Sequence, residues 1–106
     1  MKAYAVGHLH SVTMGPAIVE YVERIEATLA PFGGRYIVHG ARPEVKEGSW
    51  HGDLIVIEFP DRTAAGAWYA SPAYQAIKPL RADNSEGEIL LIDGVGAGHK
   101  ALDVLA

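Results

Sequence analysis

The chain has 106 residues, which suits one domain and is too short for two. Hydrophobic residues make up 49 % of the chain and charged residues 21 %, and these ordinary proportions exclude a disordered or fibrous protein. The net charge is −4 and no run of Lys or Arg forms a basic stripe, so nucleic acid is not an expected partner.

Targeting and redox features are also absent from the sequence. The first ten residues hold no apolar run of signal-peptide length, and no segment approaches the ~20 apolar residues of a membrane span. We therefore expect a cytoplasmic protein without a membrane partner. The absence of cysteine excludes disulfides, thiolate nucleophiles and cysteine-ligated metal centres.

The N-terminal third predicts a strand followed by a helix. Lys2 to His10 alternates between two faces, of which one carries Tyr4, Val6, His8 and His10 and the other the smaller Ala3, Ala5, Gly7 and Leu9. From Pro16 onward apolar residues recur at helical spacing: Ile18, Tyr21, Val22, Ile25, Leu29 and Phe32. The pair Gly33-Gly34 ends this helix, because glycine accepts the left-handed backbone that commonly closes one.

The middle of the chain predicts two strands joined by a long polar loop. Arg35 to Gly40 reads as a strand with Arg35, Ile37 and His39 on one face. The loop Ala41 to Gly52 has Trp50 as its one bulky apolar residue. Asp53 to Phe59 is apolar on both faces, which indicates a sheet that is covered on both sides.

The C-terminal part predicts a broken helix and a last strand. Asp61 is a natural N-cap, and the helix that begins there is interrupted at Ser71-Pro72, because Pro72 removes a donor while Ser71 can cap a new turn. A second helical piece is perturbed by Pro79 and ends before a turn at Asn84 to Gly87. The final strand is Glu88 to Asp93, and a tail follows it whose Leu102 and Leu105 require a surface to dock on.

This order of elements is that of the ferredoxin-like βαββαβ fold, an α+β architecture with a four-stranded antiparallel sheet and both helices on one face. The helix-free face would then expose a large apolar surface, which monomers seldom do. We therefore expect a homodimer in which two sheets pack face to face as a dimeric α+β barrel. Residues 1–95 form the domain, and the tail 96–106 is expected to dock on the domain or on the partner subunit.

Four stretches of the chain also carry a family resemblance: GGRYIVHG at 33–40, EGSWHGDLIVIEFPD at 47–61, AWYASPAYQAIKPLR at 67–81 and GEILLIDGV at 87–95. With them the chain resembles the Domain of Unknown Function 1330 family. The resemblance implies the dimeric α+β barrel and no established reaction. Its wider barrel relatives include cofactor-free monooxygenases, isomerases and heme enzymes, an analogy at the level of fold alone.

The preferred candidate site lies around the second predicted strand. Arg35 and His39 share a face, and Trp50 and His51 sit on the loop that follows. An arginine fork suits a carboxylate or enolate, and a histidine can move a proton near neutral pH. The competing interpretation is that Arg35 pairs with a surface carboxylate such as Glu58 and that His39 merely ends a strand.

Two further groups of residues complete the candidate site. Glu58 follows four apolar residues, so desolvation could raise its pKa toward that of a general base, although pairing with an arginine is the competing interpretation. Trp68, Tyr69 and Tyr74 surround the helix break and form either a pocket wall or ordinary core packing.

A metal site is considered and not predicted. His8 and His10 project to one side of a strand about 6 to 7 Å apart, which is workable for a metal. A third ligand from His39, Glu58 or Asp93 would have to converge on them. No metal and no cofactor are therefore expected.

The leading functional hypothesis is a small homodimer that binds a small aromatic or carboxylated molecule between sheet and helices, with cofactor-independent acid–base catalysis. Arg35 would anchor the anion, His39 or Glu58 would move the proton, and Trp50, Trp68 and Tyr74 would form the apolar wall. The alternative is a non-catalytic dimeric structural or interaction module.

Overall fold

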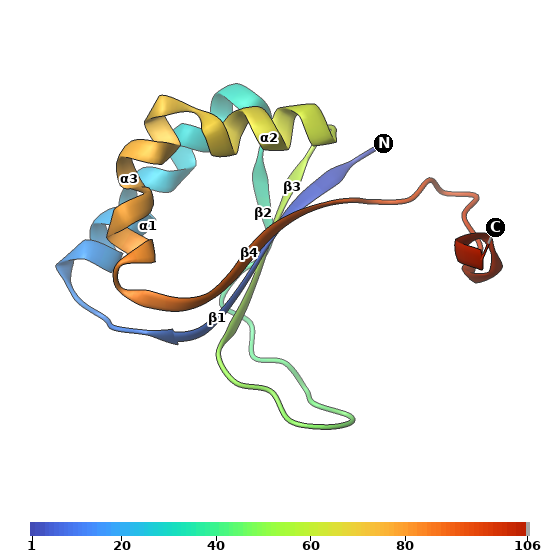
Figure 1. Cartoon of the computed structure of the whole chain (residues 1–106), viewed down its shortest axis with the longest axis horizontal. Helices are drawn as coiled ribbons and strands as arrows, with labels where there is room; N and C mark the ends of the chain where they lie inside the picture. Colours follow the sequence, from blue (N-terminus) through green and yellow to red (C-terminus); the bar gives the residue numbers. More distant parts are fainter. Residues whose placement is uncertain (106) are drawn as a thin grey trace.

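The computed structural model describes residues 1–105, which form one antiparallel sheet covered on one side by helices (Figure 1). The sheet order is β2-β3-β1-β4, built from β1 (Ala3–Val12), β2 (Arg35–Val38), β3 (Asp53–Phe59) and β4 (Ser85–Asp93). Three α-helices and two short 3₁₀ helices complete the fold: α1 (Pro16–Leu29), η1 (Ala30–Phe32), α2 (Arg62–Ala70), α3 (Pro72–Ala82) and η2 (Ala101–Leu105). The predicted ferredoxin-like α+β fold is confirmed.

The predicted helix break lies at Ser71, whose hydroxyl makes a hydrogen bond to each of the two helices. Its Oγ donates to the carbonyl of Trp68 at 2.7 Å and accepts the backbone N–H of Tyr74 at 3.2 Å. It therefore closes α2 and caps α3. Asp61 caps α2 at the other end, where its carboxylate accepts the backbone N–H of Ala64 at 2.7 Å.

Element ends differ from the predicted ones where strand pairing extends a segment. β1 continues past His10 to Val12, and β4 begins at Ser85, within the stretch that the sequence predicts as a turn. The two extensions pair with each other, with Val12 opposite Ser85. The ladder hydrogen bonds thus override the local turn preference of this polar segment.

Two more ends fall short of the prediction. β2 ends at Val38, two residues before Gly40, and α1 ends at Leu29, after which the chain tightens into η1. Pro31 lies within η1, where a short 3₁₀ turn tolerates it better than a continuing α-helix would. No helix within residues 1–105 is long and apolar enough to span a membrane.

The two faces of the sheet have different environments. The face toward the helices carries the buried core, which includes Ile57, Phe59, Trp68, Tyr74 and Ile77. The opposite face, called the open face below, carries Ile37, Leu90 and Ile92, which are 42 %, 47 % and 51 % exposed. The predicted two-sided apolar character of the sheet is therefore present, and nothing within residues 1–105 covers the open face fully.

The tail leaves β4 and runs away from the domain to η2 (Figure 1). All its described residues are exposed, including Leu102 and Leu105. The tail therefore does not pack on its own domain, and docking on a partner subunit stays a prediction. Ala106 lies outside the described residues.

Candidate binding cavity and the residues around it

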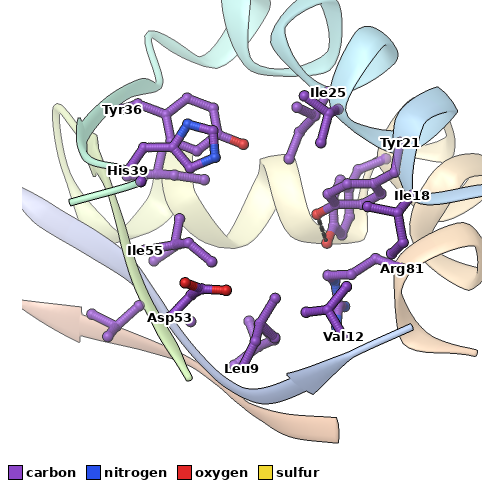
Figure 2. A pocket seen from close by; sticks show the side chains of 18 of the residues that line it. Leu9, Val12, Ile18, Tyr21, Ile25, Tyr36, His39, Asp53, Ile55 and Arg81 are labelled. Atoms are coloured by element: carbon purple, nitrogen blue, oxygen red, sulfur yellow. Dashed lines mark hydrogen bonds between the residues drawn. The ribbon is translucent and has the colours of Figure 1, made fainter. Parts of the chain in front are cut away.

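A cavity of about 290 Å³ lies between the sheet and the helices. Figure 2 shows that α1 and α3 supply one side of it and strands β1 and β3 the other. Its walls are mostly apolar, with Ile18 and Ile25 from α1, Leu9 from β1 and Ile55 from β3. A cavity with mostly apolar walls and a few polar groups is typical of a small-molecule site.

Small residues of the helix-facing row of β1 border the cavity. Ala5 and Gly7 lie on this row and line the cavity. A Cβ atom at Gly7 would lie 3.2 Å from Cδ1 of Ile89, a tighter contact than such atoms normally make. Glycine at position 7 thus lets Ile89, which also lines the cavity, lie close to β1.

Two tyrosines place hydroxyl groups at the helix side of the cavity. The hydroxyls of Tyr21 and Tyr74 are hydrogen-bonded, with 2.9 Å between their oxygens. Burial, and then the neighbouring Tyr74, raise the pKa of Tyr21 well above its usual value. Tyr21 therefore stays a neutral phenol and can act as a hydrogen-bond donor.

Arg81 brings a positive charge to the same wall. Its guanidinium lies 5.8 Å from the centre of the Tyr21 ring. Burial opposes the charge, but the hydroxyls of Tyr74 and Tyr21 outweigh it, so that the pKa of Arg81 is raised and the side chain stays charged. Nε of Arg81 is buried and has no hydrogen-bond partner within residues 1–105. A buried donor without an acceptor is unusual and costly.

His39 and Asp53 line the cavity where β2 ends and β3 begins. The His39 ring stacks on Tyr36, with 4.4 Å between ring centres and 25° between planes. Burial raises the pKa of Tyr36 to about 12. His39 itself is exposed, so it lies where the cavity meets solvent.

The structure brings three of the predicted site residues together at the cavity, namely His39, Trp68 and Tyr74. Tyr69 packs behind them, with its ring centre 6.1 Å from Trp68 and 5.4 Å from Tyr74, and does not line the cavity. Trp68 and Tyr74 are also fully buried core residues, so the pocket-wall and core interpretations both describe them.

Arg35 and Glu58 lie elsewhere, on the open face, and the prediction that Arg35 shares a face with His39 is wrong. β2 ends at Val38, and its register with β3 shifts between Tyr36 and Val38. Strand alternation therefore does not carry on to His39.

Glu58 is also not the desolvated base that its apolar neighbours suggest. Its Oε1 accepts from Lys2 Nζ at 3.0 Å and from Arg35 Nε at 3.2 Å. The hydrogen bond from Lys2, assisted by Arg35, lowers the pKa of Glu58 despite partial desolvation. The competing interpretation, a surface ion pair with arginine, is the one that the structure shows.

Trp50 and His51 likewise lie away from the cavity, beside His8 on the open face. The Trp50 ring stacks on the ring of His8 at 4.0 Å, and the carbonyl of His51 lies 2.8 Å from Nε2 of His8. These residues position a different group of side chains.

Sequence reasoning missed Tyr21 and Arg81 as cavity residues. The signal was present for Arg81, because Tyr74, Ile77 and Arg81 follow the spacing i, i+3, i+7 of one helix face. Pro79 suggested that the helix is disturbed before Arg81. In the structure α3 continues through Pro79 to Ala82.

Comparison with known proteins places the chain in a family and a fold. The profile of the family described as Domain of unknown function (DUF1330) matches residues 2–95. No curated protein matches the chain. The methylated RPA0582 protein, described in another structure as a protein of unknown function from Rhodopseudomonas palustris, has a TM-score of 0.67 and 15 % identity over 92 % of this chain and 84 % of its own.

Two further solved structures share the fold. A dimeric ferredoxin-like protein of unknown function from Jannaschia sp. CCS1 has a TM-score of 0.59 and 17 % identity, covering 91 % of this chain and all of that one. SnoaB from Streptomyces nogalater, described as a cofactor-independent oxygenase, has a TM-score of 0.56 and 14 % identity, covering 93 % of this chain and 96 % of that one. At these identities the similarity shows the fold alone.

Proposed function

The chain belongs to the DUF1330 family, and we propose that it binds a small aromatic molecule carrying a carboxylate in the cavity between the sheet and helices α1 and α3. Apolar walls would hold the ring of such a molecule. Arg81 would hold its carboxylate, taking the role that the sequence suggested for Arg35.

The observation that carries this proposal is the buried Nε of Arg81, which has no acceptor in the part of the chain that the structure describes. An unsatisfied buried donor costs roughly 1–3 kcal/mol, more when it is charged. Nε is enclosed by protein, so the Arg81 side chain would turn toward the cavity for a carboxylate oxygen to bind it, and that hydrogen bond would remove this cost. The hydroxyls of Tyr21 and Tyr74 are hydrogen-bonded to each other, which leaves one O–H to donate to the ligand. The cavity thus combines one cation with surroundings that favour a planar apolar group.

Acid–base chemistry is the second part of the proposal. His39 lies where the cavity meets solvent, stacked on Tyr36, so it can take a proton from a bound molecule and release it to water. No cofactor is needed for such a transfer. The description of SnoaB as a cofactor-independent oxygenase is compatible with this chemistry on the shared fold.

A homodimer is the third part. Exposed apolar side chains lie at both edges of the open face, with Ile37 on β2 and Leu90 and Ile92 on β4, and a second copy would cover them. The exposed leucines of the tail would then dock on the partner. The Jannaschia protein, described as dimeric, supports this arrangement. Since the open face does not depend on the cavity, a non-catalytic dimeric module remains the second candidate function.

Ligand binding tests the cavity. Isothermal titration of the wild type with benzoate, 1-naphthoate and phenylpyruvate is expected to show binding of at least one, and the matching amide of benzoate or naphthoate is expected to bind more weakly. Arg81→Gln should weaken carboxylate binding by about 10- to 100-fold, since a hydrogen bond to a charged group contributes ~1.5–3 kcal/mol. Arg24→Gln, at an exposed ion pair on α1, is the matched control and should bind as the wild type does. If neither acid nor amide binds, the dimeric module is favoured instead.

Proton transfer has its own test with phenylpyruvate, which is aromatic, carboxylated and enolisable. In D₂O the wild type is expected to speed exchange of its C3 hydrogens, followed by proton NMR. His39→Ala should keep phenylpyruvate binding and lose the acceleration. An unchanged exchange rate in His39→Ala would remove His39 from the chemistry without affecting the binding proposal.

A further inference from the structure

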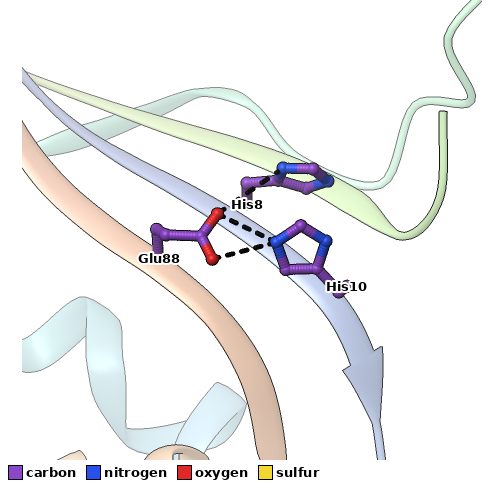
Figure 3. Close-up of side chains that lie close together, drawn as sticks. All are labelled: His8, His10 and Glu88. Atoms are coloured by element: carbon purple, nitrogen blue, oxygen red, sulfur yellow. Dashed lines mark hydrogen bonds and ion pairs between the residues drawn. The ribbon is translucent and has the colours of Figure 1, made fainter.

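A second cluster of polar side chains lies outside the cavity, on the open face at one end of the sheet. It consists of His8 and His10 from β1 and Glu88 from β4 (Figure 3). One ligand atom from each of the three lies within 4.8 Å of the other two. We propose that His8, His10 and Glu88 bind a divalent transition-metal ion such as Zn²⁺.

The sheet register supplies the third ligand that the sequence did not identify. His8 lies directly opposite Glu88 in the β1–β4 pair. The register then shifts between Leu9 and Ser11, so that His10 is one extra residue on β1. This bulge lets the ring of His10 reach the same carboxylate, with the two histidine ring centres 4.0 Å apart.

His8 is already oriented as a metal ligand. The backbone carbonyl of His51 can only accept a hydrogen bond, so Nε2 of His8 must carry the hydrogen across the 2.8 Å between them. Nδ1 therefore keeps its lone pair, and it lies 4.0 Å from Oε1 of Glu88. A carbonyl holding the second nitrogen of a histidine is the usual outer partner of a metal-bound imidazole.

Trp50 fixes the plane of the same ring. Its indole stacks on His8 with 12° between the planes, and its own Nε1 donates to the carbonyl of Gly52 at 3.1 Å. The loop between β2 and β3 thus holds His8 by one stacking contact and one hydrogen bond. Because the ring of His8 is already held in place, metal binding loses less conformational entropy at this side chain.

His10 and Glu88 need only a small adjustment. Nε2 of His10 lies 2.8 Å and 3.0 Å from the two carboxylate oxygens of Glu88. In a tetrahedral zinc site, ligand atoms about 2.1 Å from the ion are about 3.4 Å from each other. Both side chains are exposed and can open by this amount. The ion would take the place of the hydrogen on Nε2, which moves to Nδ1 as the ring changes tautomer.

The ligand set indicates the kind of ion. Two imidazoles and one carboxylate suit zinc and its transition-metal neighbours, whereas magnesium and calcium prefer oxygen ligands alone. Three protein ligands leave a fourth position for water.

Zinc titration of the chelator-treated, tag-free full chain tests the site by isothermal calorimetry. One ion per chain is expected to bind, and Mg²⁺ at the same concentrations should not compete. Glu88→Gln and His10→Gln should each weaken Zn²⁺ binding at least tenfold, with folding checked by far-UV circular dichroism. Cobalt offers a second readout, since His8→Gln should lose the visible absorption of a four-coordinate Co²⁺ site.

His99→Gln is the matched control, because His99 and Asp103 in the tail form a histidine–carboxylate pair at 3.8 Å. This variant should bind zinc as the wild type does. The proposal is overturned if wild type shows no saturable zinc binding, if Glu88→Gln binds as tightly as wild type, or if His99→Gln loses binding to the same degree. None of these outcomes bears on the cavity ligand.

Discussion

At the scale of single residues, the neighbours of a charged side chain decide whether its hydrogen bonds are complete. Glu58 accepts hydrogen bonds from two cations, whereas Arg81 lies beside the tyrosines Tyr21 and Tyr74 and has a buried Nε without an acceptor among residues 1–105. The carboxylate of Glu58 has cationic partners, so we interpret this group of side chains as structural. The hydrogen bonding of Arg81 is incomplete, which is why Arg81 and not Arg35 is the residue on which the binding proposal depends.

Because the pKa of Glu58 is lowered in the folded protein, we expect the stability of the protein to depend on pH. The pKa is lowered chiefly by the hydrogen bond from Lys2, so the contribution of Glu58 to stability is complete above the ordinary glutamate pKa and is lost as the pH falls through the lowered value. Thermal unfolding of wild type and Glu58→Gln should therefore differ most at pH 5–7 and converge in strongly acidic solution.

Glu20→Gln is the control for this experiment, because it removes the same charge from a single exposed pair with Arg24. If the curves of wild type and Glu58→Gln run parallel from pH 7 to pH 2, the two cations do not perturb Glu58 as described.

At the scale of elements, the junction between α2 and α3 is held by one hydroxyl. Ser71 ends one helix and starts the next, and the turn between them places Trp68 and Tyr74 side by side, with 4.2 Å between their ring centres. Without this break, a continuous helix would direct these two residues to different sides. The cavity wall thus depends on the break between α2 and α3.

Ser71→Ala is expected to lower the free energy of unfolding by about 1 kcal/mol, since loss of a serine N-cap costs roughly 0.5–2 kcal/mol. Urea unfolding followed by circular dichroism measures this change. Ser49→Ala, in the exposed loop between β2 and β3, is the matched control and should stay within about 0.5 kcal/mol of wild type. Equal stability of the two variants would show that the backbone alone fixes the junction.

At the scale of the whole molecule, the open face and the tail carry apolar side chains that a monomer would leave in contact with water. Ile37, Leu90 and Ile92 lie on one face of the sheet, and Leu102 and Leu105 extend beyond the domain. A face-to-face pair of sheets would bury the first group and could receive the second.

Leu90→Glu tests this arrangement. A buried unpaired carboxylate at the interface is costly, so the variant should be a monomer at micromolar concentrations at which the wild type has twice the mass of the chain by light scattering. Val19→Glu is the matched control, since Val19 on α1 is 50 % exposed and Leu90 47 %. A wild type that scatters as a monomer, or a Leu90→Glu protein that stays dimeric, contradicts the proposed interface.

Much of the fold could be predicted from the sequence, because periodicity and capping residues mark each element. Asp61 and Ser71 begin helices as predicted, and the apolar run 53–59 is a strand. Strand ends were harder, since Ser85 joins β4 through its pairing with Val12, a partner more than 70 residues away.

The candidate site was predictable only in part. Alternation along a strand is reliable until the register shifts, and the shift after Tyr36 separates His39 from Arg35. Arg81 was not predicted as a cavity residue because Pro79 suggested a disturbed helix, whereas α3 in fact continues through Pro79. Glu88 could not be linked to His8 because sequence alone does not state which residues of β1 and β4 lie opposite each other.

Because side chains alternate along β1, one side of this strand borders the cavity and the other side belongs to the open face. Ala5 and Gly7 border the space beneath the helices, while His8 and His10 belong to the other side. Substitutions at odd and even positions therefore affect separate sites, so that a change at the proposed cavity site need not alter the proposed metal site. A single inserted residue would reverse both sides at once, and we expect length changes here to be far less tolerated than replacements.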